Sequence, residues 1–244
     1  MKAYKTGILF VHGIQGSPGQ FSFLTDQLPP SVPVRNILLP GHGATTAEFR
    51  KATAEQWMDA VRKASASLEQ TCEHILFVGH SMGCLLGLLT EQERKVFAGM
   101  LLLCCPFRIH PTFRHLRGSL SAAGKKTPTS DPFILAAREA NSVSAEHAVS
   151  YLFCGRPYAE LLRLIQRTKK QTLSIPDKTV FCFSEKDEIV SRKSIPYVKD
   201  HLHNDPVILS GCGHDYYTPA GQSLISRILL CMINGLNEKN PLPR

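Results

Sequence analysis

The sequence predicts a single α/β domain, with a mostly parallel sheet of about six strands, helices on both faces and a helical insertion. Two observations predict this fold class. Short apolar runs typical of buried strands alternate along the chain with longer segments of helical periodicity. The chain has 244 residues, 43% of them hydrophobic, which is enough for one sizeable core. This length favours a single domain over two. Strands separated by helices therefore favour a parallel sheet.

Six apolar runs are predicted to be the strands: Gly7–Val11, Val32–Leu39, His74–Val78, Phe97–Cys104, Lys178–Ser184 and Val207–Ser210. Helices are predicted between them, over Phe21–Leu28, from Thr53 to about Glu69, over Met82–Glu93 and over Pro219–Leu236. Thr53 and Gln56, three residues apart, form the pattern of a capping box and indicate where the second of these helices begins.

Residues 106–172 interrupt this alternation, because they contain no convincing strand. Helices are predicted there after Pro132, over Ser144–Phe153 and over Tyr158–Thr172. We therefore expect residues 106–172 to form an insertion on a core made of residues 1–105 and 173–244.

Charge and hydropathy exclude several classes of protein. A mean hydropathy of −0.08 with 20% charged residues argues against a disordered chain. No run reaches the roughly 18 uncharged apolar residues of a membrane helix. The net charge is +8, and nearly all of it comes from residues 108–172, with eleven basic and four acidic side chains. That segment has no nucleic-acid motif and no basic run longer than two, so a solvated basic face is favoured and no nucleic-acid partner is expected.

The cysteines and the first residues predict the compartment. None of the eight cysteines has the C-x-x-C spacing of a zinc or redox site, and most lie inside apolar segments. Residues 1–6 lead directly into the first predicted strand, without the features of a signal peptide. We expect buried, reduced thiols in a cytoplasmic protein.

The strongest chemical motif is Gly79-His80-Ser81-Met82-Gly83, which follows one predicted strand and opens a predicted helix. A G-x-S-x-G motif in that context forms a tight turn that exposes the serine hydroxyl at a helix N-terminus. The two glycines leave room because a side chain there would collide across the turn. Ser81 is therefore the candidate nucleophile, and a serine of this kind needs a base to remove its proton.

Of the ten histidines, only His214 has the order and context expected of that base, since it lies in a glycine-rich loop after a late strand. The acid that orients it is predicted to be Asp187, just past the strand before, with Glu185 as the second choice. Glu188 is expected to face solvent. Asp215 adjoins the histidine and would struggle to reach its Nδ1.

An oxyanion hole completes such a site with backbone N–H donors. One donor is expected from Met82, the residue after the nucleophile. The other should come from the loop after the first strand, where Ile14 is the candidate by position.

Together these motifs resemble the α/β-hydrolase superfamily, and within it the carboxylesterase and monoacylglycerol-lipase-like branch, also described as serine aminopeptidase or lysophospholipase-like. The resemblance rests on six segments outside residues 106–172: Phe10–Gly16, Leu39–Gly43, Thr53–Asp59 with Trp57, Gly79–Gly83, Glu185–Glu188 and Gly213–His214. It implies an α/β-hydrolase fold with Ser81, Asp187 and His214 as the catalytic triad, Ile14 and Met82 as oxyanion donors, and neither a metal nor an organic cofactor. The chain starts at what would be the family's third strand, so six strands are expected and not eight.

The resemblance implies a serine esterase that cleaves a small-molecule carboxylic ester, either a short- to medium-chain acyl ester or a monoacylglycerol-like lipid. The same residues also permit an acyltransferase, a peptidase, or a ligand-binding or signalling protein with slow turnover. The insertion lies where such enzymes carry a lid, and its basic surplus suggests weak association with anionic lipid surfaces. Nine of its apolar side chains fit two roles equally well, an acyl pocket or the lid's own core: Phe107, Phe113, Leu116, Phe133, Ile134, Leu135, Tyr151, Leu152 and Phe153.

Overall fold

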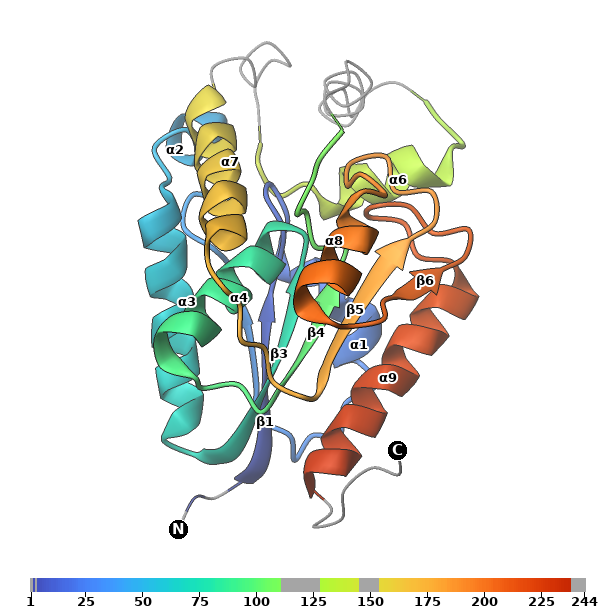
Figure 1. Cartoon of the computed structure of the whole chain (residues 1–244). Coiled ribbons are helices and arrows are strands. Elements are labelled where there is room, and N and C mark those ends of the chain that lie inside the picture. Colours follow the sequence, from blue (N-terminus) through green and yellow to red (C-terminus); the bar gives the residue numbers. More distant parts are fainter. Residues whose placement is uncertain (1, 3, 111–127, 145–153, 238–244) are drawn as a thin grey trace.

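A computed structural model of the chain describes residues 2, 4–110, 128–144 and 154–237. Its centre is a six-stranded sheet in the order β2-β1-β3-β4-β5-β6, in which every neighbouring pair of strands is parallel (Figure 1). The strands are β1 (Tyr4–Val11), β2 (Val34–Ile37), β3 (Cys72–His80), β4 (Gly99–Leu103), β5 (Thr179–Ser184) and β6 (Val207–Leu209).

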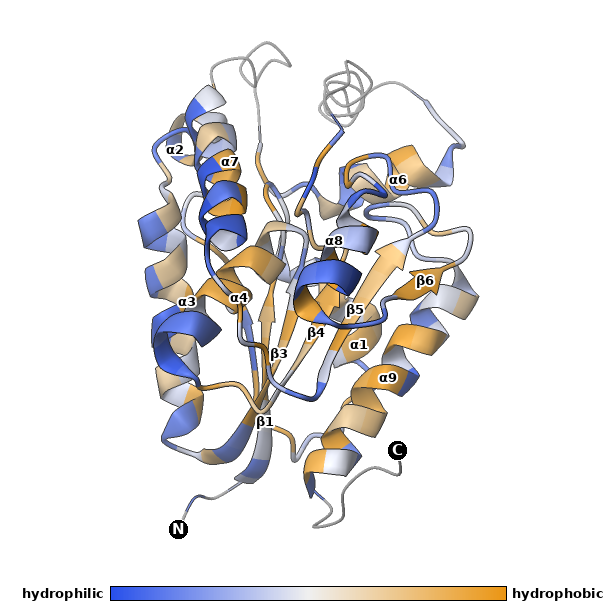
Figure 2. Cartoon of the chain, in the orientation of Figure 1, coloured by the Kyte–Doolittle hydropathy of each residue, from blue (hydrophilic) through white to orange (hydrophobic). Residues whose placement is uncertain are grey.

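Alternate residues of the central strands enter two apolar layers, one on each face of the sheet. Leu9 and Val11 of β1 belong to one layer, and Ile8 and Phe10 belong to the other; all four are fully buried. This period of two follows from the pleat, and burial on both faces explains why the strands are continuous apolar runs (Figure 2).

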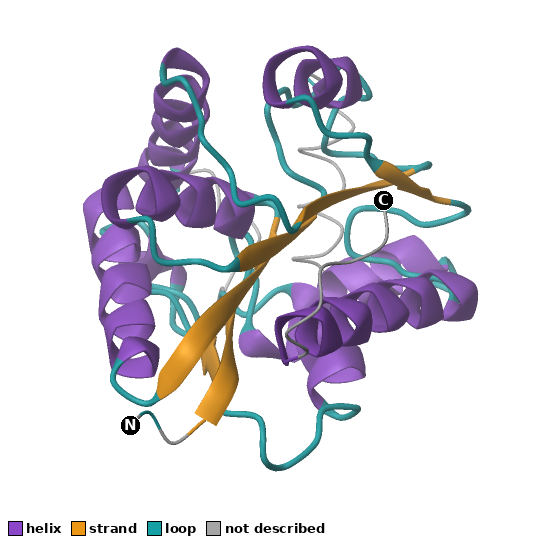
Figure 3. Ribbon diagram, turned by 60° about the horizontal axis from the view of Figure 1, so that its bottom comes forward, coloured by secondary structure: helices purple, strands orange, loops and turns teal. Residues whose placement is uncertain are grey.

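Helices cover both layers. On one face α3, α4, α7 and α8 contribute to the core, and on the other face α1 and α9 do so (Figure 3). The helices are η1 (Pro18–Phe21, a 3-10 turn), α1 (Ser22–Thr25), α2 (Thr46–Phe49), α3 (Ala54–Glu69), α4 (Met82–Arg94), α6 (Pro132–Ala140), α7 (Gly155–Lys170), α8 (Ser194–Leu202) and α9 (Pro219–Asn237). None of the helices in the described ranges is long and apolar enough to cross a membrane.

The predicted fold class and the six parallel strands are confirmed, and the capping box of Thr53 and Gln56 is present at the start of α3. The helix expected over Phe21–Leu28 is wrong in extent, because its N-terminal part is the 3-10 turn and α1 ends at Thr25, before two consecutive prolines. The single turn of α2 was not predicted, since four residues carry no readable periodicity.

The described parts of residues 106–172 lie in different places. Leu161, Leu164 and Ile165 of α7 pack into the same core layer as α3 and α4, and Phe107 is buried there against Phe181 and Tyr197. These contacts make α7 part of the helical layer over the sheet. The helix expected over Ser144–Phe153 lies almost wholly outside the described residues, as do Phe113, Leu116, Tyr151, Leu152 and Phe153.

All eight cysteines are free thiols, and every one except Cys231 is buried. Because all six strands run in the same direction, the loops that follow them meet at one edge of the sheet, the upper edge in Figure 1. The loops after β1, β3, β5 and β6 carry every residue that the sequence singled out for chemistry.

Candidate active site

Ser81 lies in a strained turn between β3 and α4, with φ +50° and ψ −119°. Such a conformation is rare for a residue with a side chain and is retained only where the surroundings enforce it. A Cβ on Gly83 would lie 2.0 Å from the carbonyl oxygen of Val11, so glycine is required for the turn to pack against β1. The Ser81 N–H donates to the Leu103 carbonyl (2.9 Å). Within the described residues, the Ser81 hydroxyl makes no hydrogen bond.

Asp187 and His214 form a buried pair. The Nδ1–H of His214 donates to Asp187 Oδ2 (3.0 Å) and is 3.1 Å from Oδ1, and both side chains are 5% exposed. The carboxylate is itself held in place by the N–H groups of Ile189 and Val190, which donate to Oδ1 (2.8 and 2.7 Å). Asp187 therefore orients the imidazole, as the acid of a triad does.

The pKa values of this pair shift in opposite directions. Burial lowers the pKa of His214, but the charge and hydrogen bond of Asp187 outweigh it and hold that pKa well above its ordinary value. Burial raises the pKa of Asp187, and the charge of His214 together with the hydrogen bonds to the carboxylate brings it below its ordinary value. The two charged forms stabilise each other.

The other carboxylates of this region accept hydrogen bonds from groups other than the His214 ring. Glu185 accepts the Gly211 N–H (2.8 Å) and the Ser210 hydroxyl (3.1 Å), so it faces the start of the next loop and not the imidazole. Glu188 is exposed, as expected, but its Oε2 also accepts the backbone N–H of His214 (3.1 Å). Asp215 accepts from the side chain of Gln20 (2.9 Å).

The loop after β1 lies directly against Ser81. A Cβ on Gly13 would be 2.9 Å from the Cβ of Ser81, so only glycine lets the loop approach this closely. No hydrogen bond to another described residue uses the N–H of Ile14 or of Met82. An oxyanion hole needs unpaired backbone donors near the nucleophile. Met82 follows Ser81 in the chain, and Ile14 follows Gly13, the residue that packs against Ser81.

Segments far apart in the chain support this loop. His12 is fully buried, its Nε2 accepts the N–H of Leu39 (3.0 Å) and its Nδ1 donates to the Gly13 carbonyl (2.8 Å). Burial, followed by the neighbouring His42, lowers the pKa of His12 to about 3, so the ring stays neutral. The indole N–H of Trp57 donates to Pro40 (2.9 Å). The Leu39–Gly43 segment and Trp57 thus support the loop after β1.

Two residues that sequence reasoning gave no role, His80 and Cys104, contact His214. The His80 ring lies 4.8 Å from the His214 ring, between centroids, and its Nε2 donates to the His214 carbonyl (2.9 Å). Cys104, with φ +53°, follows β4, and its sulfur is in contact with the imidazole. No local motif marks Cys104, which is brought to the site only because β4 lies between β3 and β5.

His80, Cys104 and His214 each offer one ligand atom within 4.8 Å of the others. This is the group of side chains in the described residues that could hold a metal ion. His214 uses its Nδ1 on Asp187, and His80 uses its Nε2 on the His214 carbonyl. A metal ion could therefore be bound only by the second nitrogen of each ring.

Comparison with known proteins adds a family and a fold. The family model described as the alpha/beta hydrolase family matches residues 8–222. A thermostable monoacylglycerol lipase of Bacillus sp. (strain H-257) is 28% identical over 98 residues, which are 39% of this chain and 38% of that protein. The aligned region thus spans well under half the length of this curated relative.

Solved structures resemble the whole chain. A monoacylglycerol lipase of Paleococcus ferrophilus has a TM-score of 0.65 at 16% identity, covering 95% of this chain and 96% of that one. A peroxisomal alpha-beta-hydrolase of Saccharomyces cerevisiae has a TM-score of 0.68 at 13% identity, covering 100% of this chain and 80% of that one. At such identities the likeness establishes the fold.

Proposed function

Because this chain belongs to the alpha/beta hydrolase family, we propose that it hydrolyses carboxylic esters through an acyl-enzyme on Ser81. The observation that carries the proposal is the buried Asp187–His214 pair at the same edge of the sheet as the strained Ser81 turn. The free N–H groups of Ile14 and Met82 beside that turn support it. The roles of these five residues are part of the proposal.

The reaction proceeds in two halves. His214 takes the proton of Ser81, whose oxygen attacks the ester carbonyl, and the N–H groups of Ile14 and Met82 stabilise the oxyanion. His214 then protonates the leaving alcohol, and water repeats the sequence on the acyl-enzyme. The Ser81–His214 hydrogen bond forms in the substrate complex, since nucleophile–base hydrogen bonds are often long in free enzymes.

The proposed substrates are short- to medium-chain acyl esters or monoacylglycerol-like lipids, supported by the partial similarity to a monoacylglycerol lipase. A second candidate is a ligand-binding protein of the same family with slow turnover. It is favoured by the raised pKa of His214 and by the Ser81 hydroxyl, which no described base contacts.

Labelling and turnover together test both candidates. A fluorophosphonate probe should react with Ser81, and p-nitrophenyl esters of increasing acyl length should be hydrolysed with a burst of p-nitrophenol before steady state. Labelling without turnover would support the slow-turnover candidate and contradict the esterase. A protein that is neither labelled nor active would contradict both. Matched amides and added alcohols would reveal peptidase or acyltransferase activity.

We expect the acid limb of the kcat/KM profile to lie above pH 6.5. A general base works only when neutral, so a raised pKa of His214 moves the loss of activity to higher pH. The charge of Asp215 contributes to that raised pKa, and Asp215→Asn should therefore move the limb to lower pH. Asp26→Asn, at an exposed position after α1 whose charge does not act on His214, is the control and should leave it in place. A wild-type limb at or below pH 6.5 would contradict the assignment of the base.

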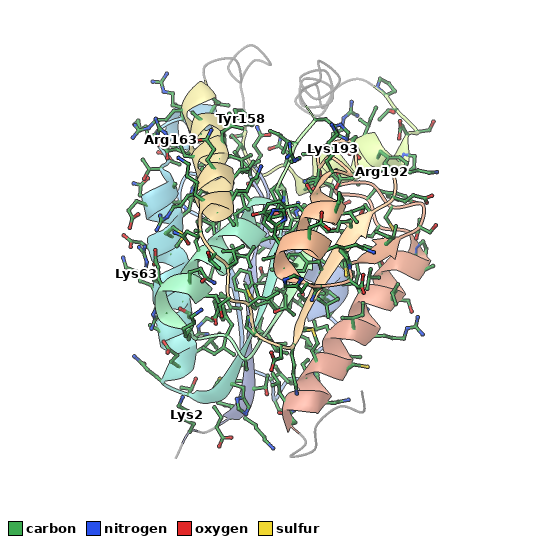
Figure 4. All side chains as sticks on the ribbon, in the orientation of Figure 1. Lys2, Lys63, Tyr158, Arg163, Arg192 and Lys193 are labelled. Carbon is green, nitrogen blue, oxygen red and sulfur yellow. The ribbon has the colours of Figure 1, made fainter. Side chains whose placement is uncertain are left out.

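Basic side chains lie at the end of the molecule that carries the site. Arg163 projects from α7, and Arg192 and Lys193 lie before α8 (Figure 4). If they attract anionic lipid surfaces, ester hydrolysis should be faster in anionic than in neutral micelles at low salt, and the difference should disappear as salt screens it. Equal, salt-independent rates in both micelles would exclude such an attraction.

A further inference from the structure

The four residues after α6, Asn141–Ser144, connect two loops of the site; we call them the bridging segment. Ser144 forms a parallel bridge with Thr45, and its N–H donates to the Ala44 carbonyl (2.9 Å). Val143 is buried against Phe49, in a cluster that also contacts Ile14. The bridging segment thus packs between the Leu39–Gly43 loop region and the loop after β1.

Ser142 makes the central contacts of this segment. Its backbone N–H donates to the Gln15 carbonyl (2.8 Å). Its hydroxyl donates to the Gly16 carbonyl (2.6 Å) and accepts the N–H of Gly43 (3.1 Å). The Ser142 hydroxyl therefore links the two loops, as a donor to Gly16 and as an acceptor from Gly43. Alanine at position 142 would leave both loop groups without this partner.

The loop that Ser142 holds is a strained turn. The Gly16 N–H donates to the Gly13 carbonyl (3.1 Å), which closes a turn with Ile14 and Gln15 at its centre. Gln15 has φ +60°, a left-handed conformation that costs free energy in any residue other than glycine. At the other end of the turn, the Gly13 N–H donates to the side chain of Gln20 (3.3 Å). The turn is thus held by Gln20 at its start and by Ser142 at its end.

We propose that Ser142 is a positioning residue for the oxyanion hole. Its hydroxyl contacts the carbonyls of both Gln15 and Gly16 (3.2 and 2.6 Å), and by holding them it keeps the turn in the conformation that aims the Ile14 N–H at the substrate oxygen. This inference rests on the proposed function, in which that N–H stabilises the oxyanion. Such donors accelerate a reaction only when they are already in place, because reorganisation during the reaction would cost what they gain. Ser142 itself does not touch the substrate.

Ser142→Ala should lower kcat for p-nitrophenyl esters about tenfold, less than the hundredfold or more expected for loss of a donor, and change KM less than twofold. Ser144→Ala is the matched control, because it lies in the same segment and, among the described residues, its exposed hydroxyl bonds only to the Ala44 carbonyl (3.3 Å). Rates are divided by the concentration of sites that fluorophosphonate titrates, so that partial unfolding is not counted as lost catalysis.

A second readout separates positioning from general stability. An aryl trifluoromethyl ketone forms an oxyanion adduct with the serine, whereas the corresponding methyl ketone binds without one. Ser142→Ala should weaken binding of the first about tenfold and leave the second unchanged. Equal loss for both ketones, or wild-type turnover per titrated site, would overturn the inference while leaving the proposed function intact.

The two proposals fail in different ways. If the wild-type protein hydrolyses no ester but fluorophosphonate labels Ser81, the esterase fails, and slower labelling of Ser142→Ala than of Ser144→Ala would still support the positioning role. Labelling of both variants at the wild-type rate would overturn it. A wild-type protein that is not labelled at all would overturn both proposals.

Discussion

Ser81→Ala should reduce ester hydrolysis by on the order of a thousandfold or more, because no other hydroxyl occupies the elbow between β3 and α4. In the proposed mechanism the remaining groups bind substrate and stabilise the oxyanion but provide no atom to form the acyl-enzyme. The measurement is kcat/KM across the ester panel for the wild type and the variant. Residual activity within tenfold of the wild type would show that another group is the nucleophile.

Ser226→Ala is the matched control for this loss. Ser226 is 4% exposed and Ser81 is 3% exposed, but Ser226 lies in α9, on the opposite face from α4. Its substitution should leave kcat/KM unchanged. Loss of activity in both variants would point to a general effect of removing buried hydroxyls.

The strain at Ser81 should be measurable as a difference in stability between two inactive variants. Ser81→Gly relieves the strain of φ +50° and ψ −119°, so its free energy of unfolding should be about 1 kcal/mol higher than that of Ser81→Ala. Denaturant unfolding of the two inactive variants measures this difference. Equal stabilities would show that the turn stores no strain.

Gly83→Ala should have the largest effect on stability, a loss of about 3 kcal/mol or more. The added Cβ would lie 2.0 Å from the carbonyl oxygen of Val11 and 2.9 Å from that of His12. Both are backbone atoms at the end of β1, which is paired with β2 and β3, so they cannot move aside as a flexible side chain can. For a chain of this size the melting temperature should fall by roughly 6–12 °C.

Gly155→Ala is the control, since no described atom lies within 4 Å of the Cβ that it would add at the start of α7. Its stability should equal or slightly exceed that of the wild type. A melting temperature of Gly83→Ala within 2 °C of the wild type would mean that the elbow can rearrange. In that case the close contact with β1 would not be what positions Ser81.

Much of the fold and of the candidate site could be predicted because the signals are local. A short apolar run such as the one before Gly79 predicts a strand buried on both faces of a sheet, whichever strands it pairs with. The G-x-S-x-G turn depends on residues that are neighbours in sequence. The choice between Asp187 and Glu185 was harder, since both follow β5. The structure separates them: Asp187 contacts the His214 ring, whereas Glu185 caps the loop at Gly211.

Other features could not be predicted because their partners are distant in sequence. His80 and Cys104 contact His214 across more than 100 residues, and Ser142 contacts Gln15 over a similar separation. A serine in a loop carries no sign of which carbonyl it will face. α7 packs on the core, whereas Phe133 of α6 contacts Tyr216 in the loop that carries His214. This division of the segment likewise depends on packing that no periodicity in it reveals.

The sequence by itself determined which segments form the parallel strands and which side chains are candidates for chemistry, because hydrophobic period and turn chemistry act between near neighbours. Only the tertiary structure decided which carboxylate meets the imidazole, which thiol lies beside it and which serine holds the turn at Ile14. Those contacts depend on how the loops that follow five different strands are placed relative to one another, and the packing of the whole sheet decides that placement.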